Sequence, residues 1–304
     1  MTGCPEMCKR NLKGYAARVL RKIGACALSM AEELRCGKSM LIEHGEPRSL
    51  YRLPAGYDLW LNYTGYIDKQ IISKGEFEPA STRAIKRFVK KGDVVIDVGA
   101  NIGYYTVLLS KLVGASGKVI AFEPTRHFGD VLRRNIEANR LSNVEVVNFG
   151  LSNKTQDLLI DIGPSSATLH SPAGFDAIIS HEIISLTTLN EFVKQDLPGK
   201  IDFIKMDIDG HEPLFFEGAW DALEKYSPIV IFEVSHLHYL EAGVSAWDFY
   251  DLVRSKGYNF FYEEDFTEIA TREDFLRRCA NFAYSSNVLI TKQNLLGSSP
   301  SRGG

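Results

Sequence analysis

The sequence predicts a doubly wound α/β domain, in which helices cover both faces of a mostly parallel sheet. Short apolar runs recur along the chain, and residues 94–98 (VVIDV) are typical of a parallel strand buried on both faces. Similar runs occupy residues 118–122, 144–149, 201–206 and 229–234. Stretches with a helical spacing of apolar residues lie between them, at 104–113, 128–139 and 214–224. A glycine-rich turn follows the first run directly, and this strand–turn–helix alternation favours a doubly wound sheet.

The segment ahead of this alternation divides into a basic helix and a lead-in. The first forty residues carry eight Lys and Arg against three Glu, and their apolar residues recur at helical spacing. We therefore expect residues 1–48 to form an amphipathic extension that docks on the domain, with contact to an anionic membrane as the alternative. Residues 49–72 are strand-like, and residues 78–90 predict a helix with Pro79 in its first turn. Together, residues 49–91 form the lead-in to the core.

The predicted core domain spans residues 92–292 and is interrupted once. Between residues 153 and 189, two short strands at 158–162 and 183–186 flank a loop rich in Gly, Pro and Ser. Late strands at 258–262 and 287–291 complete the sheet. The tail, residues 293–304, is low in complexity, which predicts disorder.

Composition narrows the class of protein. The formal net charge is −3 and hydrophobic residues make up 45% of the chain, so nothing favours nucleic acid as the main partner. The five cysteines are unevenly placed and do not suggest a disulfide framework or a zinc site. The sequence shows neither an apolar run long enough to span a bilayer nor a secretory leader at its start, which predicts a cytoplasmic protein.

The strongest chemical signal is the turn DVGANIG, which runs from Asp97 to Gly103. Glycines there let the backbone approach a ligand at the start of a helix, whereas a tight turn without a ligand is the alternative interpretation. The turn lacks the G-x-G-x-x-G pattern of dinucleotide sites, and the Asp97 carboxylate would repel a pyrophosphate. It suits a ligand with a cationic end, such as S-adenosylmethionine. The cofactor-binding residues predicted from the turn are Asp97, Gly99, Ala100, Asn101 and Gly103.

A second cofactor signal is Glu123, which ends the next strand and is followed by Pro124. An acid about twenty residues after the glycine turn is placed to accept hydrogen bonds from two ribose hydroxyls. A solvated charge at the strand end is the alternative. In combination with the glycine turn, the pattern favours ribose binding, and both residues join the predicted cofactor site.

The candidate catalytic residues follow the fourth strand, at the edge of an open α/β sheet where ligands bind. Four ionisable groups occur within six residues there, and we expect catalysis by Asp207, His211 and Glu212, with Lys205 orienting the acids. Either His211 or Asp207 could remove a proton from an acceptor hydroxyl. A solvated turn in which the acids cap a helix is the alternative.

The fifth strand ends in a further acid, Glu233, with His236 and His238 close behind it. Its position at the same sheet edge makes Glu233 the last candidate catalytic residue. The histidines are interpreted as part of a plain loop, and no metal site is expected, although an acidic metal site at this edge stays open.

Three motifs together resemble the FkbM family of class I S-adenosylmethionine-dependent methyltransferases. They are DVGANIGYY at 97–105, FEP at 122–124 and IKMDIDGHE at 204–212. The resemblance implies a seven-stranded sheet with an antiparallel final strand, Asp97 and Gly99 beside the methionine moiety, and Glu123 at the ribose. It also implies O-methylation of sugars or other hydroxyl-bearing metabolites. The chain departs from the family pattern at Asp209, where Glu is usual, and at Asn190, where Asp is usual.

The function predicted from the sequence is methyl transfer from S-adenosylmethionine to a hydroxyl of a small-molecule or glycan acceptor. A non-catalytic S-adenosylmethionine-binding protein is one alternative, and the acidic group of residues 207–212 argues against it. A nicotinamide-dependent oxidoreductase on the same fold is the other, and the missing dinucleotide pattern argues against that.

Overall fold

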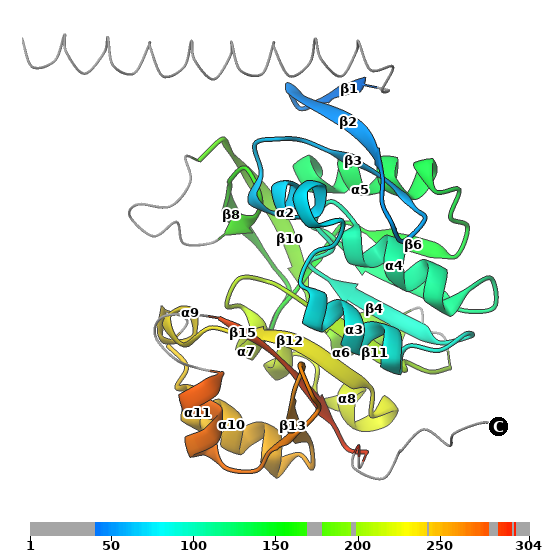
Figure 1. Ribbon diagram of the computed structural model, residues 1–304. Helices are drawn as coiled ribbons and strands as arrows, with labels where there is room; N and C mark the ends of the chain where they lie inside the picture. Colours follow the sequence, from blue (N-terminus) through cyan, green and yellow to red (C-terminus); the bar gives the residue numbers. More distant parts are fainter. Residues whose placement is uncertain are drawn as a thin grey trace, which may run out of the picture.

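The computed structural model describes residues 40–168, 178–195, 199–241, 243–279, 285–293 and 295. Figure 1 shows a central twisted sheet with helices on both faces and a smaller sheet above it. Within the described residues the central sheet has eight strands. In spatial order they are β14 (Glu268–Ile269), β13 (Asn259–Tyr262), β15 (Ser286–Thr291), β12 (Ile229–Val234), β11 (Phe203–Met206), β4 (Val94–Val98), β5 (Lys118–Phe122) and β6 (Val144–Val147).

The strand order confirms the predicted α/β architecture. Strands β6, β5, β4, β11 and β12 are parallel, while β15 lies antiparallel between β12 and β13. This is the expected seven-stranded sheet with an antiparallel final strand, to which the two-residue β14 adds an edge. The order reverses between β4 and β11, where Asp97 pairs with Lys205 in register. Ligands bind at such a switch point, beyond the carboxyl ends of the strands.

The apolar strands alternate between two cores. Ile96 and Val98 of β4 face one core and Val95 faces the other, as the period of two in a strand requires. One face of the sheet is covered by α3 (Pro79–Phe88), α4 (Tyr104–Val113) and α5 (Arg126–Ala138). The other is covered by α6 (Leu189–Gln195), α7 (Glu212–Glu217), α8 (Trp220–Tyr226), α9 (His236–Glu241), α10 (Ala246–Ser255) and α11 (Arg272–Arg278).

The lead-in differs from its prediction in one element. Strands β1 (Met40–Glu43), β2 (Glu46–Arg52) and β3 (Asp58–Leu61) form an antiparallel sheet, so strand structure begins ahead of residue 49. The strand predicted to continue to residue 72 is wrong, because Tyr66–Lys74 forms helix α2. Gly75 ends α2 in the left-handed conformation, with φ of 76°, a common helix stop.

A single helix predicted at 214–224 is likewise wrong, because Gly218 separates α7 from α8. A Cβ at Gly218 would lie 2.1 Å from the carbonyl oxygen of Ser152, so the two backbones pack closer than a side chain allows. The break therefore follows from a tertiary contact.

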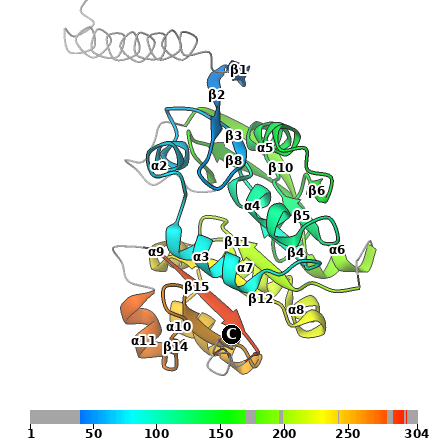
Figure 2. The same cartoon turned by 45° about the vertical axis from the view of Figure 1, so that its right-hand side comes forward.

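The predicted interruption forms a further, four-stranded sheet beside the central one, visible in Figures 1 and 2. Its order is β7 (Gly150–Leu151), β10 (Ser180–Thr187), β8 (Gln156–Ile162) and β9 (Ala167–Thr168). Strands β8 and β10, predicted as 158–162 and 183–186, pair antiparallel with Ile160 opposite Glu182. We call this four-stranded sheet the insert.

The expectations for the amphipathic helix in the first forty residues and for the far end of the tail fall outside the described residues. None of the described helices is both long and apolar enough to cross a membrane.

Candidate functional site

The glycine turn after β4 is held in place by its own backbone geometry. Gly99 and Gly103 have φ of 77° and 90°, and Asn101 has φ of 52°. A Cβ at Gly99 would lie 2.0 Å from the carbonyl oxygen of Asp207, so only glycine permits this close approach of two loops. The Asn101 side chain accepts a hydrogen bond from the amide of Ile102 at 2.7 Å, which supports the left-handed conformation locally.

Glu123 lies directly beneath this turn and is almost completely buried, at 4% exposure. Its Oε2 accepts a hydrogen bond from the Asn101 amide at 2.8 Å, and its Oε1 accepts from the amide and hydroxyl of Thr125 at 2.9 and 2.6 Å. Burial raises the pKa of the carboxyl group. A carboxylate offers about four lone-pair positions, so one stays available to a ligand.

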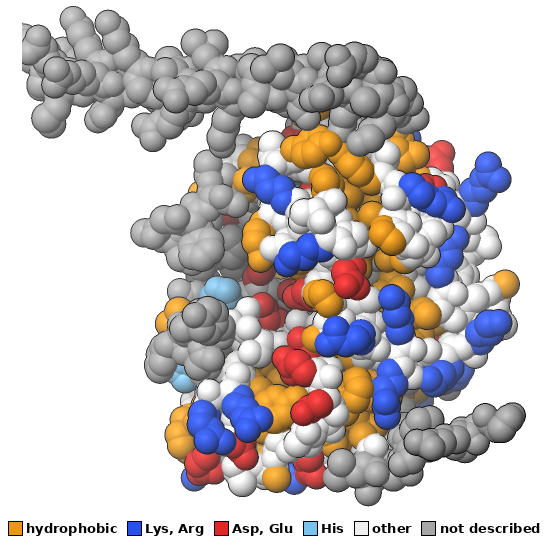
Figure 3. All heavy atoms as spheres, viewed as in Figure 1, with side chains coloured by type: hydrophobic (Ala, Val, Ile, Leu, Met, Phe, Trp, Pro, Cys, Tyr) orange, Lys and Arg blue, Asp and Glu red, His pale blue; other side chains and the backbone are white. Residues whose placement is uncertain are grey.

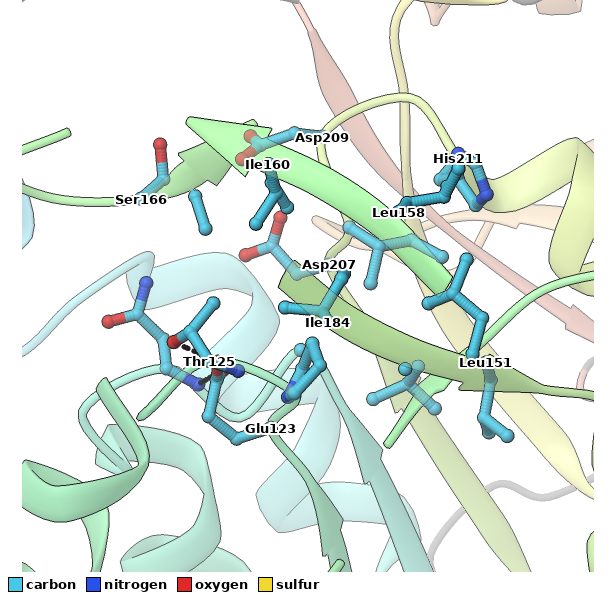
Figure 4. Close-up of a pocket in the computed structure, with 18 of the residues that line it drawn as sticks. Glu123, Thr125, Leu151, Leu158, Ile160, Ser166, Ile184, Asp207, Asp209 and His211 are labelled. Carbon is cyan, nitrogen blue, oxygen red and sulfur yellow. Dashed lines mark hydrogen bonds between the residues drawn. The ribbon is translucent and has the colours of Figure 1, made fainter. Parts of the chain in front are cut away.

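A cavity opens above Glu123, between the sheet edge and the insert (Figure 4). Leu158 and Ile160 of β8, with Ile184 and Leu186 of β10, supply an apolar wall. Polar groups gather at the opposite end, where Figure 4 shows Asp207 and Asp209 on the same side as Ser166. We call this space the nucleoside cavity, because an apolar wall over a hydrogen-bonding floor suits an aromatic base with a sugar.

A smaller cavity continues from the polar end. Gly99, Asn101, Ser166, Asp207 and Asp209 line both spaces. The smaller cavity is also lined by Ala100, Tyr105, Lys205 and residues of the lead-in, among them Ile67 and Phe77. The lead-in and the insert therefore close the site from above.

Three carboxylates meet at the ends of β11 and β12. Among the described residues, Asp207, Asp209 and Glu233 each bring one oxygen to within 4.8 Å of the others, a spacing that could hold a cation. Burial, followed by the charge of Asp207, raises the pKa of Asp209 to about 7. The same causes raise the pKa of Glu233 well above its ordinary value. We call these three residues the carboxylate cluster.

Lys205 supplies positive charge inside the protein next to this cluster. The residue is 4% exposed and its Nζ donates to Asp207 Oδ2 at 3.0 Å. The same Nζ lies 4.6 Å from the centre of the Tyr105 ring, within the range of a cation–π contact. Lys205 thus holds Asp207 in a fixed position, as an orienting residue would.

Asp97 lies behind the cavities, on the strand next to Lys205. It is fully buried, its Oδ2 accepts from the Thr106 hydroxyl at 2.6 Å, and its Oδ1 has no hydrogen-bond partner within the described part of the chain. Burial raises its pKa and the charge of Lys205 opposes the rise. Neither Asp97 nor Gly103 lines the two cavities, so a direct cofactor contact stays a prediction for both.

His211 and Glu212 lie at the start of helix α7, and neither belongs to the carboxylate cluster. His211 Nε2 lies 3.0 Å from the Ser152 hydroxyl, and Figure 4 shows its ring at the apolar end of the nucleoside cavity, beside Leu158. Glu212 is fully buried, with Oε1 accepting from the Ile208 amide at 3.2 Å. Burial raises the pKa of Glu212 to about 8.

A third cavity lies on the other side of the cluster. Glu233 lines it together with Glu78, Glu263 and Asn287. Because Glu233 also lies within 4.8 Å of Asp207, this space borders the same carboxylate cluster as the nucleoside cavity. We call it the acidic recess.

The family follows from a match to the model of the methyltransferase FkbM domain, which extends over residues 97–279 and therefore over more than half of the chain. The chain belongs to the FkbM methyltransferase family. The resemblance carried by the three sequence motifs is confirmed.

Individual relatives of this FkbM-family chain are distant. The hexuronic acid methyltransferase AglP of Haloferax volcanii is 26% identical over 151 residues, which cover 49% of this chain and 59% of AglP. A protein-L-isoaspartate O-methyltransferase of Methanothrix thermoacetophila is 28% identical over 88 residues, covering 28% of this chain and 42% of that protein. The chain thus spans about half the length of these two relatives.

Among solved structures, a methyltransferase FkbM from Methylobacillus flagellatus aligns with a TM-score of 0.41 and 19% identity. The alignment covers 66% of this chain and 43% of that one.

Some residues that line these cavities were not predicted from the sequence. Asp209 was counted among the four ionisable groups after the fourth strand but was not a candidate site residue, yet it lines both cavities. Asp209 has φ of 50°, and Gly210, which follows it, has φ of 92°. An Asp-Gly pair directly after a strand is typical of a turn, and this pattern could have marked the position in the sequence. The apolar wall of the insert was also missed.

Proposed function

We propose that this protein transfers a methyl group from S-adenosylmethionine to a hydroxyl group of a sugar or another small metabolite. One observation carries the proposal: the carboxylate cluster joins the two cofactor-side cavities to the acidic recess, so two ligands can meet there. The family supports methyl transfer. AglP is named as a hexuronic acid methyltransferase, which supports a sugar as the acceptor here but not the charge of that sugar.

The residues around the nucleoside cavity fit the cofactor. Glu123 retains an acceptor position for a ribose hydroxyl, and the leucine and isoleucine side chains of the insert can cover an adenine ring. Asp207 and Asp209 place negative charge in the smaller cavity, where the cationic end would lie. The unpartnered Oδ1 of Asp97 adds a further buried acceptor behind that cavity. When bound, S-adenosylmethionine supplies an electrophilic methyl group on its sulfonium.

Glu233 is the residue that we assign to proton removal, because it alone of the carboxylate cluster lines the acidic recess. Its raised pKa makes it a stronger proton acceptor than an exposed glutamate. Positive charge bound beside Asp207 would lower that pKa again and favour the ionised form. As the acceptor oxygen gains the methyl group, Glu233 takes up the hydroxyl proton.

His211, one of the two bases that the sequence left open, is the alternative. Its place at the apolar end of the nucleoside cavity favours a contact with the cofactor over a contact with the acceptor. Lys205 and Asp207 act together as a positioning pair, because the 3.0 Å hydrogen bond fixes the Asp207 carboxylate. Glu212, whose Oε1 accepts from the Ile208 amide, stabilises the loop after β11.

The proposal is tested with the purified full chain and S-adenosylmethionine that carries an isotope-labelled methyl group. We expect calorimetry to detect cofactor binding, and mass spectrometry to detect labelled products in a panel of sugars, glycosides and other hydroxyl-bearing metabolites. Cofactor binding without turnover across the panel would favour a non-catalytic role. Preference for a nicotinamide dinucleotide over S-adenosylmethionine would overturn the proposal.

A further inference from the structure

The acidic recess combines carboxylates from three separate parts of the fold. Glu78 precedes α3, Glu233 lies near the end of β12, and Glu263 and Glu264 follow β13. Among the described residues that line this space, none is Lys, Arg or His. In Figure 3 a band of acidic side chains runs down the middle of this face, at the level of α3, β12 and β15.

The carboxylates of the acidic recess are held by neutral groups. Glu78 accepts a hydrogen bond from the Tyr105 hydroxyl at 2.7 Å, and Glu263 accepts one from the Ser81 hydroxyl. The Ser81 hydroxyl in turn accepts from the Asn287 side chain at 3.0 Å. These contacts orient the oxygens and supply no compensating positive charge.

The nearest cations offset the charge of the recess only in part. The Lys205 ammonium is held by Asp207 at 3.0 Å on the cofactor side of the cluster, and its charge opposes the rise in the pKa of Glu78 that burial causes. Arg83 is exposed and does not line the recess. Burial and the neighbouring acids Glu78 and Glu264 raise the pKa of Glu263 to about 7, and the charge of Arg83 offsets only part of that rise.

We infer that the acceptor of the proposed methyl transfer is a hydroxyl-rich molecule without a negative charge, so that a neutral sugar is accepted and a uronic acid or sugar phosphate is rejected. The inference rests on the proposed function of the same site. Sugar hydroxyls donate hydrogen bonds, and Glu263, which is ionised above its pKa of about 7, then only accepts them, so the two are complementary. An anionic acceptor would lose its water in the recess without gaining a cationic partner, which is strongly unfavourable.

The test compares three acceptors that differ at one position: a methyl hexoside, the corresponding hexuronoside, and the methyl ester of that hexuronoside. The ester matches the uronate in shape but carries no charge. The assay uses the full chain and S-adenosylmethionine at pH 8. We expect kcat/KM for the uronate to be at least about ten-fold lower than kcat/KM for the ester, because even a modest loss of transition-state binding lowers the rate by that factor. Equal turnover of acid and ester, or a preference for the acid, would overturn the inference.

A charge reversal at Glu264, at the rim of the acidic recess, tests whether the recess causes the preference for the ester over the acid. Glu264 is exposed, so Glu264→Lys should leave the fold intact while placing a cation at the recess. We expect this variant to narrow the ester-to-acid ratio by at least about three-fold, and Glu264→Gln to narrow it less. Glu224→Lys, an equal change at an exposed position of α8, is the control and should leave the ratio unchanged. An unchanged ratio in Glu264→Lys would remove the recess from the explanation.

The failure of this inference differs from failure of the proposed function. Turnover of the uronate at the rate of the ester contradicts the charge argument and leaves methyl transfer intact. Cofactor binding without turnover of any sugar contradicts the proposed acceptor class, and with it this inference.

Discussion

The substitution Glu123→Ala tests how the protein would hold the ribose. Glu123 accepts three hydrogen bonds within the protein and has one acceptor position left for a ligand. Loss of a charge-assisted hydrogen bond to ribose costs about 1.5–3 kcal/mol, which corresponds to a roughly ten- to hundred-fold weaker Kd. Isothermal titration calorimetry with S-adenosylmethionine and S-adenosylhomocysteine measures this change directly.

The same substitution also removes internal contacts, so a control must separate the two effects. Thr125→Val deletes the hydroxyl that donates to Glu123 at 2.6 Å and accepts from the Phe128 amide at the start of α5. This variant should lose about 1 kcal/mol of stability, the usual value of a helix cap, while its Kd for the cofactor changes less than three-fold. An unchanged Kd in a folded Glu123→Ala protein would refute the assignment of Glu123 to the ribose. Equal weakening in both variants would show that local structure alone explains the effect.

Three further predictions concern the carboxylate cluster and its neighbours. Glu233→Gln should lower kcat by about a hundred-fold or more, while its affinity for the cofactor stays within three-fold of the original. His211→Ala should instead weaken cofactor binding more than it lowers kcat. The reverse pattern in steady-state kinetics would assign proton removal to His211. Because the pKa of Asp209 is raised from 3.8 to about 7, the folded state retains a proton that the unfolded state loses, and stability falls as pH rises from about 4 to 7. The Tm of Asp209→Asn should therefore rise relative to the Tm of the original chain between pH 5 and pH 8, by roughly 2–4 °C for each kcal/mol of added stability. A difference in Tm that stays constant across that range would contradict the predicted sign of the pH dependence. Chelation with EDTA should leave turnover unchanged, because the Lys205 ammonium already neutralises Asp207, and a loss of activity that Mg²⁺ restores would instead assign the cluster to a metal ion.

The sequence predicted the sheet well, and it singled out residues of the glycine turn and Glu123 that line one cavity of the structure, because these features are local. The apolar run of β4, the glycine turn and Glu123 follow from short patterns within single strand–turn–helix units. The switch in strand order between β4 and β11 then brings Lys205 opposite Asp97. Patterns of this kind depend on backbone geometry more than on distant partners.

The parts that could not be predicted depend on contacts between distant segments. The break between α7 and α8 occurs because Gly218 packs on the backbone of Ser152. The acidic recess brings Glu78 and Glu263 together across most of the chain, and no local pattern marks either residue. His211 follows the correct strand, but the direction of its side chain depends on Ser152, which lies 59 positions earlier.

The most direct test of the proposed cofactor site is a crystal structure of the full chain with S-adenosylhomocysteine. We expect the ribose hydroxyls within hydrogen-bond distance of Glu123, the adenine against Leu158 and Ile160, and the sulfur atom facing Asp207 and Glu233. A nucleoside bound elsewhere, or one whose sulfur points away from the carboxylate cluster, would contradict it.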